Sequence, residues 1–132
     1  MNIHIICVGK LKEAYLKDAC AEYEKRLSRF AKVKMTQIAE PIAERASRAE
    51  ELAVMAKEGA KILSAIGAND YVVTLCVEGK QMPSDIFASH ISKCALEGKS
   101  NLTFVIGGSL GLAEEVKKRS HLRLSFSEMT FP

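Results

Sequence analysis

Three segments of the sequence place glycine or aromatic residues beside polar ones, and each lies at the end of an apolar run that is typical of a buried strand. In an open parallel sheet, ligands bind beyond the carboxyl ends of the strands. We therefore predict that a binding site forms where these strand ends meet. The three segments are residues 75–80 (LCVEGK), 106–112 (IGGSLGL) and 125–132 (SFSEMTFP).

The middle segment contains Gly107, Gly108 and Gly111, in the pattern G-G-x-x-G. This is neither the dinucleotide fingerprint G-x-G-x-x-G nor the P-loop with its Lys-Ser/Thr ending. Glycines after a strand let a ligand approach the backbone closely, and no lysine follows at the offset that phosphate binding needs. The segment favours a neutral or cationic nucleoside over a triphosphate. A tight turn between strand and helix is the alternative interpretation.

The last segment places two aromatic residues and a methionine, Phe126, Phe131 and Met129, among the polar Ser127, Glu128 and Thr130. Such a mixture either packs or binds something, because large apolar side chains are seldom left without a partner. From the residues alone, a ligand-binding segment and a segment that closes the core remain equal alternatives.

Positive charge is concentrated near the amino terminus of a chain whose net charge is only +3 and whose pI is near 8.7. Residues 10–34 contain eight Lys or Arg against four acidic residues, including Lys10 and Lys12. Phosphate contact with a nucleic acid is the functional interpretation. A solvated helix face is the other, and composition alone favours it.

Cysteine and histidine do not predict a metal site. No C-x-x-C pair occurs, so we expect buried, reduced thiols. His90 and Cys94 stand at i, i+4 on a predicted helix, but two ligands do not close a site. We interpret His121 as a structural or surface residue. The four cysteines are Cys7, Cys20, Cys76 and Cys94.

The 132 residues suit one domain, and strand and helix patterns alternate along all of it. This alternation predicts an α/β domain with a mainly parallel sheet and helices on both faces. Residues 33–38 should lie near a sheet edge, and residues 78–80 should form a turn. Strands are expected at residues 3–8, 33–38, 71–77, 102–106 and 122–126. A helix is expected after the first strand and up to about residue 30, and further helices at residues 40–66, 83–95 and 112–119.

The sequence resembles the large-subunit ribosomal RNA methyltransferase H family, within the SPOUT superfamily of knotted methyltransferases. The resemblance covers the whole chain, and its last two blocks are highly specific together. The matching blocks are residues 8–13 (VGKLKE), 23–27 (YEKRL), 73–75 (VTL), 104–112 (FVIGGSLGL) and 124–132 (LSFSEMTFP).

The resemblance implies a trefoil-knotted α/β fold, a homodimer and S-adenosylmethionine as methyl donor, with no metal. It also implies N3 methylation of a pseudouridine in 23S ribosomal RNA on the assembled ribosome. Carried over by position, the donor should lie against Leu75, Gly107 and the run Phe126, Ser127, Glu128, Met129, Thr130 and Phe131. We expect Gly107 to leave room for the adenosine, so that Gly107→Val would block donor binding with little loss of fold. Lys10 and Lys12 are the candidate RNA contacts.

Family members continue past the Phe-Pro step into a C-terminal helix, whereas this sequence ends at Pro132. We expect that the chain lacks this tail, and we therefore assign no catalytic base. A truncated, non-catalytic module that binds a nucleoside or the ribosome is the alternative function. An enzyme acting on nucleotide phosphates is a third, disfavoured by the absent phosphate motifs. With no apolar run of membrane-spanning length and no signal-peptide pattern, we expect a cytoplasmic protein without membrane contact.

Overall fold

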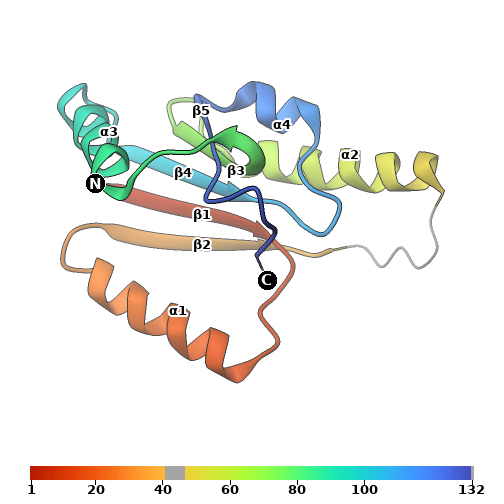
Figure 1. The fold of residues 1–132 in the computed structure, drawn as a ribbon, viewed down its shortest axis with the longest axis horizontal. Helices are drawn as coiled ribbons and strands as arrows, with labels where there is room; N and C mark the ends of the chain where they lie inside the picture. Colours follow the sequence, from red (N-terminus) through yellow and green to blue (C-terminus); the bar gives the residue numbers. More distant parts are fainter. Residues whose placement is uncertain (41–46, 132) are drawn as a thin grey trace.

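The computed structural model describes residues 1–40 and 47–131, which form one parallel sheet with helices packed around it (Figure 1). The strand order is β2-β1-β4-β3-β5, and each neighbouring pair is parallel. The predicted α/β class is confirmed, and residues 33–38 do lie at a sheet edge. The elements are β1 (Asn2–Val8), α1 (Ala14–Leu27), β2 (Lys32–Ile38), α2 (Arg48–Ala65), β3 (Tyr71–Lys80), α3 (Ser84–Leu96), β4 (Asn101–Ile106), α4 (Glu114–Arg119) and β5 (Leu122–Leu124).

The core has two halves, one on each face of the sheet. Val72 of β3 packs with Ile62 of α2 and Val116 of α4, whereas its neighbour Val73 packs with Cys94 of α3 on the opposite face. Successive strand residues point to opposite faces, so a strand covered on both faces is apolar at most positions. This explains the nearly continuous apolar sequences of β1 and β3.

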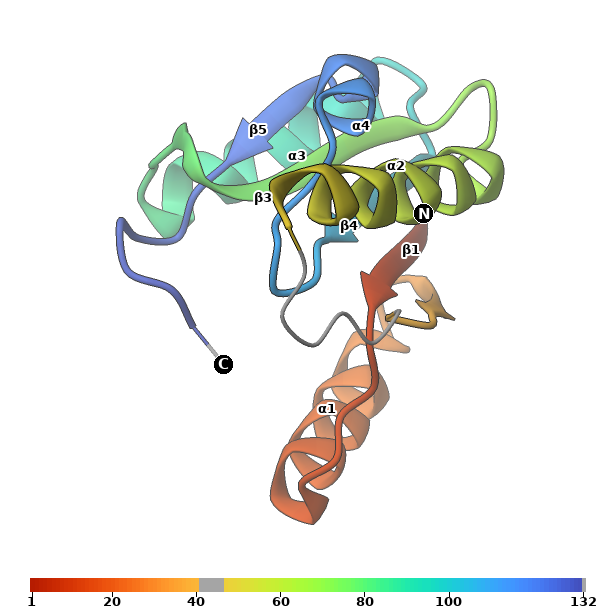
Figure 2. The ribbon, with the colours of Figure 1, turned by 90° about the vertical axis from the view of Figure 1, so that its right-hand side faces the viewer.

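Helix α1 is an exception to this packing. It contacts β2 but has no buried residue, and Figure 2 shows it projecting away from the other helices. Tyr15 and Tyr23 on α1 are 69% and 61% exposed, and Phe30 just after it is 79% exposed. The apolar stripe that predicts this helix is therefore left largely uncovered.

Two helices begin later than predicted. The helix expected from residue 40 begins at Arg48, where the Ser47 hydroxyl caps it by accepting a hydrogen bond from the Glu50 N–H at 3.2 Å. Glu40 is not helical, and residues 41–46 of that prediction lie outside the described residues. The helix expected from Leu112 begins at Glu114, because Leu112 and Ala113 are instead buried in the core.

The turn predicted at residues 78–80 is wrong, because β3 continues to Lys80. Leu124 of β5 pairs with both Leu75 and Lys80, so the intervening residues bulge out of register. At Gly79 a Cβ atom would lie 2.8 Å from backbone atoms of Arg123 and Leu124. Glycine is required here because one backbone crosses directly against another.

The four thiols are free, but only Cys94 is buried as predicted. Cys7, Cys20 and Cys76 are half-buried and belong to neither core cluster. Among the described helices, none has the length and apolar character needed to cross a bilayer.

Candidate functional site

The structure brings the three predicted segments together at the carboxyl edge of the sheet. Leu75 is the register partner of Ile106 on one side and of Leu124 on the other. Gly107 directly follows Ile106, and Phe126 comes two residues after Leu124. Three segments that are far apart in sequence therefore end side by side on β4, β3 and β5, where ligands of parallel sheets bind.

The segment from Gly107 to Leu112 forms a compact loop. The Gly111 N–H donates to the Gly108 carbonyl at 3.0 Å, and Gly111 has a φ of +82°, which favours glycine. A Cβ atom on Gly107 would lie 3.0 Å from the side chain of Leu112, which is buried. The missing side chain of Gly107 therefore makes room for Leu112, and the expectation that it also leaves room for the adenosine stays a prediction.

The segment after β5 turns outward rather than into the core. Phe126, Met129 and Phe131 are 69%, 73% and 61% exposed, so the alternative that they close the core is wrong. Ser125 is buried and its hydroxyl donates to the Ser127 carbonyl at 2.9 Å, while the Ser127 hydroxyl accepts from the Met129 N–H at 3.0 Å. The segment is an ordered turn that presents apolar side chains at its surface; Glu128 and Thr130 are also exposed.

The charged residues at the end of β3 serve the fold. Lys117 of α4 forms an ion pair with Glu78, and this bond holds the pKa of Glu78 below its ordinary value. The Lys80 carbonyl accepts a hydrogen bond from the Ser125 N–H at 3.0 Å. These contacts attach α4 and the segment after β5 to β3, and thereby position both of them beside the site.

A fourth strand end also reaches the site, and it was not among the predicted segments. Glu40 follows β2, and one oxygen of its carboxylate accepts from the Ser109 N–H at 3.1 Å and the Ser109 hydroxyl at 2.7 Å. These bonds, and to a lesser extent the charge of Lys12, lower the pKa of Glu40. The rule that ligands bind beyond the carboxyl ends of parallel strands would have predicted Glu40 if it had been applied to β2.

The two candidate RNA-contacting lysines lie at the same edge. Lys10 and Lys12 follow β1 and are exposed. Lys12 is near enough to Glu40 to affect its pKa, which places it beside the glycine loop. Lys10 lines a shallow cavity of about 340 Å³ between α1 and β2, together with Lys17 and Glu24. Positive charge therefore borders the site on the β1 side.

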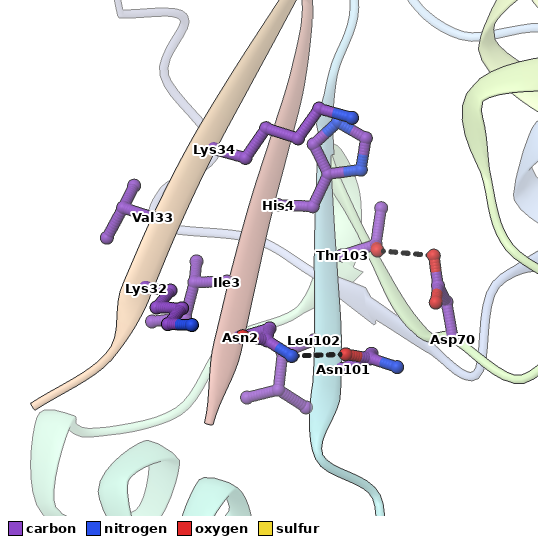
Figure 3. Close-up of a pocket in the computed structure, with 10 residues that line it drawn as sticks. All are labelled: Asn2, Ile3, His4, Lys32, Val33, Lys34, Asp70, Asn101, Leu102 and Thr103. Atoms are coloured by element: carbon purple, nitrogen blue, oxygen red, sulfur yellow. Dashed lines mark hydrogen bonds between the residues drawn. The ribbon is translucent and has the colours of Figure 1, made fainter.

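A second cavity of about 340 Å³ lies at the opposite, amino edge of the sheet and contains none of the predicted site residues (Figure 3). Several of its polar groups already have hydrogen-bond partners. The His4 Nε2 lies 2.7 Å from the Thr36 hydroxyl, and the Thr103 hydroxyl donates to Asp70 at 2.9 Å. Burial, with help from Lys34, lowers the pKa of His4. We assign no ligand to this cavity.

The histidines of the second half of the chain are engaged in structural contacts. His90 shares a hydrogen bond of 2.7 Å with the Tyr71 hydroxyl. His121 accepts from the Val72 N–H at 2.9 Å and stacks on Tyr71 with a centroid separation of 4.7 Å, which agrees with the structural role expected for it. Within residues 1–40 and 47–131, no three potential metal ligands cluster.

Comparison with known proteins agrees with this geometry. Residues 1–132 match the family described as "Predicted SPOUT methyltransferase". Three similar proteins bear the name "Ribosomal RNA large subunit methyltransferase H", from Leuconostoc citreum (strain KM20), Streptococcus uberis (strain ATCC BAA-854 / 0140J) and Clostridium botulinum (strain Eklund 17B / Type B). They are 51%, 50% and 53% identical, over 100% of this chain and 84% of each relative. The chain belongs to the ribosomal RNA large subunit methyltransferase H family of SPOUT methyltransferases.

Proposed function

We propose that this protein transfers a methyl group from S-adenosylmethionine to N3 of a pseudouridine in 23S ribosomal RNA, on the assembled ribosome. The observation that carries the proposal is the meeting of Leu75, Gly107 and the segment 126–131 at one sheet edge, in a family whose relatives are named ribosomal RNA methyltransferases. We further propose that this edge is the donor site.

The residues at the edge suit a nucleoside with a sulfonium side chain. Leu75 offers apolar contact to an adenine ring, and the exposed Phe126 and Phe131 can exclude water from it. Backbone N–H and C=O groups of the loop from Gly107 to Leu112 and of the turn at Ser127, other than those engaged in the internal bonds described above, would hydrogen-bond the base edge. No lysine cradle for phosphates is present in these segments, which favours a donor without a phosphate chain.

The reaction depends above all on the alignment of the methyl donor with the acceptor nitrogen. Methyl transfer from a sulfonium is an in-line displacement, so the protein must hold the donor methyl carbon against the acceptor nitrogen. The N3 proton must also leave, and a base or a positively charged neighbour of the deprotonated ring would serve. We assign no residue of this chain to that step. The role of the protein is to bind the two substrates, to orient them and to exclude water.

The quaternary structure and topology that accompany this proposal are a homodimer and a trefoil knot. The exposed Tyr15, Tyr23 and Phe30 support the dimer, because a monomer rarely exposes several large apolar side chains along one helix. The close backbone crossing of Gly79 against Arg123 and Leu124 supports a chain that passes under its own β3–α3 connection. A ribosomal substrate would place the protein in the cytoplasm.

Transfer of labelled methyl groups to ribosomes tests the function. Ribosomes lacking the modification should gain one donor-dependent methyl group at a pseudouridine of 23S ribosomal RNA, whereas free RNA should gain none. Donor and ribosome binding without transfer would instead favour the non-catalytic module. Labelling of another substrate with ribosomes left unlabelled would contradict the proposal.

Removing the charges of Lys10 and Lys12 should weaken ribosome binding. We choose Lys10→Gln with Lys12→Gln, because a carboxylate at position 12 would repel Glu40. The two lost phosphate contacts should reduce the slope of log affinity against log salt by about 1.5. The control is Lys57→Gln with Lys118→Gln, an equal loss of charge at exposed positions of α2 and α4. If the slope of log affinity against log salt is the same in both double variants, Lys10 and Lys12 do not contact the RNA.

A further inference from the structure

We propose that Glu40 is a positioning residue for the methyl donor, because its carboxylate holds the Gly108–Ser109 turn in the conformation to which the donor binds. This inference rests on the proposed function, since it concerns the same edge of the sheet. Glu40 would touch the glycine loop rather than the reacting atoms. Nothing in the strand-end motifs of the sequence assigns it this role.

The hydrogen bonds of Glu40 connect strands that are not neighbours. The order β2-β1-β4 places β1 between the strand that Glu40 follows and the strand that the glycine loop follows. The side chain therefore spans the end of β1 to reach Ser109. A single oxygen, Oε1, accepts both the Ser109 N–H at 3.1 Å and the Ser109 hydroxyl at 2.7 Å. Hydrogen bonds to a charged acceptor are stronger than neutral ones.

The carboxylate of Glu40, an exposed residue, lies against two glycines, and at Gly108 the missing side chain leaves the space that it occupies. A Cβ atom on Gly108 would lie 2.9 Å from Glu40 Oε1 and 3.0 Å from Val8 Cγ1. Gly9, at the end of β1, has a φ of +91°, and its N–H donates to the Ile38 carbonyl at 2.8 Å. A Cβ atom there would lie 3.5 Å from the other carboxylate oxygen. The carboxylate is thus packed between the β1 end and the loop, not free in solvent on all sides.

Glu40 accepts these bonds as an ionised carboxylate. The bonds from Ser109 and, less strongly, the charge of Lys12 lower the pKa of Glu40. A carboxyl group whose pKa lies below its already acidic ordinary value is ionised at neutral pH. On α2, Glu58 is only 4% exposed, and burial together with the charge of Glu40 raises the pKa of Glu58.

Two measurements on the whole chain test the proposal: the dissociation constant for S-adenosylmethionine by calorimetry, and amide hydrogen exchange of Ser109 by NMR. Glu40→Ala removes the acceptor and should weaken donor binding about tenfold while Ser109 exchange becomes faster. Glu40→Gln keeps a carbonyl oxygen that can accept both bonds, and should bind within about threefold of wild type. The control, Glu24→Ala on α1, removes one exposed carboxylate and should change neither measurement.

Three outcomes would overturn the proposal. Unchanged donor affinity in Glu40→Ala, with faster Ser109 exchange, would make Glu40 a structural residue only. If Glu40→Gln binds the donor as weakly as Glu40→Ala does, the effect comes from the charge of Glu40 rather than from the conformation of the turn. If the wild-type chain does not bind S-adenosylmethionine, the proposed donor site itself is refuted. This outcome differs from the other two because it is seen without any variant. In that case faster exchange in Glu40→Ala would still show that Glu40 holds the turn.

Discussion

Gly79→Ala is expected to destabilise the protein by about 3 kcal/mol, because a Cβ atom at this position would lie 2.8 Å from the backbone of Arg123 and Leu124. Backbone atoms cannot rotate away as a side chain can, so β3 and β5 must separate. For a chain of this size the loss corresponds to a fall in Tm of about 10 °C. Thermal unfolding followed by circular dichroism measures it.

Gly98→Ala is the matched control for Gly79. Gly98 has a φ of +80°, but no atom lies within 4 Å of its missing Cβ, so alanine there meets conformational strain without a clash. We expect it to cost about 1 kcal/mol. If Gly79→Ala lowers the free energy of unfolding no more than Gly98→Ala does, β3 and β5 do not approach each other as closely as described.

Gly107→Val is expected to abolish measurable donor binding, with a rise in Kd of at least about a hundredfold, and to destabilise the chain by about 2 kcal/mol. The cause is the displacement of Leu112, whose side chain lies 3.0 Å from the position of the new Cβ and is only 5% exposed. Moving Leu112 distorts the whole loop to Gly111 and with it the backbone groups offered to the donor. Calorimetry and thermal unfolding measure the two effects.

A double variant tests whether Gly107 and Leu112 pack as described. Leu112→Ala removes the atoms that a new Cβ at position 107 would meet. Gly107→Ala should therefore be less destabilising in the Leu112→Ala background than in wild type, by about 1 kcal/mol. Strict additivity of the two substitutions would mean that Gly107 and Leu112 do not pack as described.

The sheet and its carboxyl edge could be predicted because they depend on local patterns. The run from Tyr71 to Val77 is apolar at nearly every position, and such a run is typical of a strand covered on both faces. Once the strands are parallel, their carboxyl ends must share an edge. The association of Leu75, Gly107 and Phe126 at one edge follows from that rule and needs no knowledge of side-chain packing.

The features that sequence patterns did not reveal depend on partners far along the chain. Glu40 bonds to Ser109, 69 residues away, and nothing near Glu40 in the sequence indicates that contact. Residues 78–80 have turn-like composition, yet pairing with Leu124 extends them as part of β3. Gly107 was interpreted as leaving room for the adenosine, whereas its close packing against the buried Leu112 appears only when the loop is folded.

The most direct test of the donor site is an NMR titration of the isotopically labelled chain with S-adenosylmethionine. We predict saturable shifts in the amides of residues 107–112 and 125–131, at the carboxyl edge of β4 and β5. The amides of Asn2, Lys32 and Asn101, which line the cavity at the opposite edge, should not move. Shifts confined to that opposite cavity, or no saturable shifts at all, would contradict the placement of the donor at this edge.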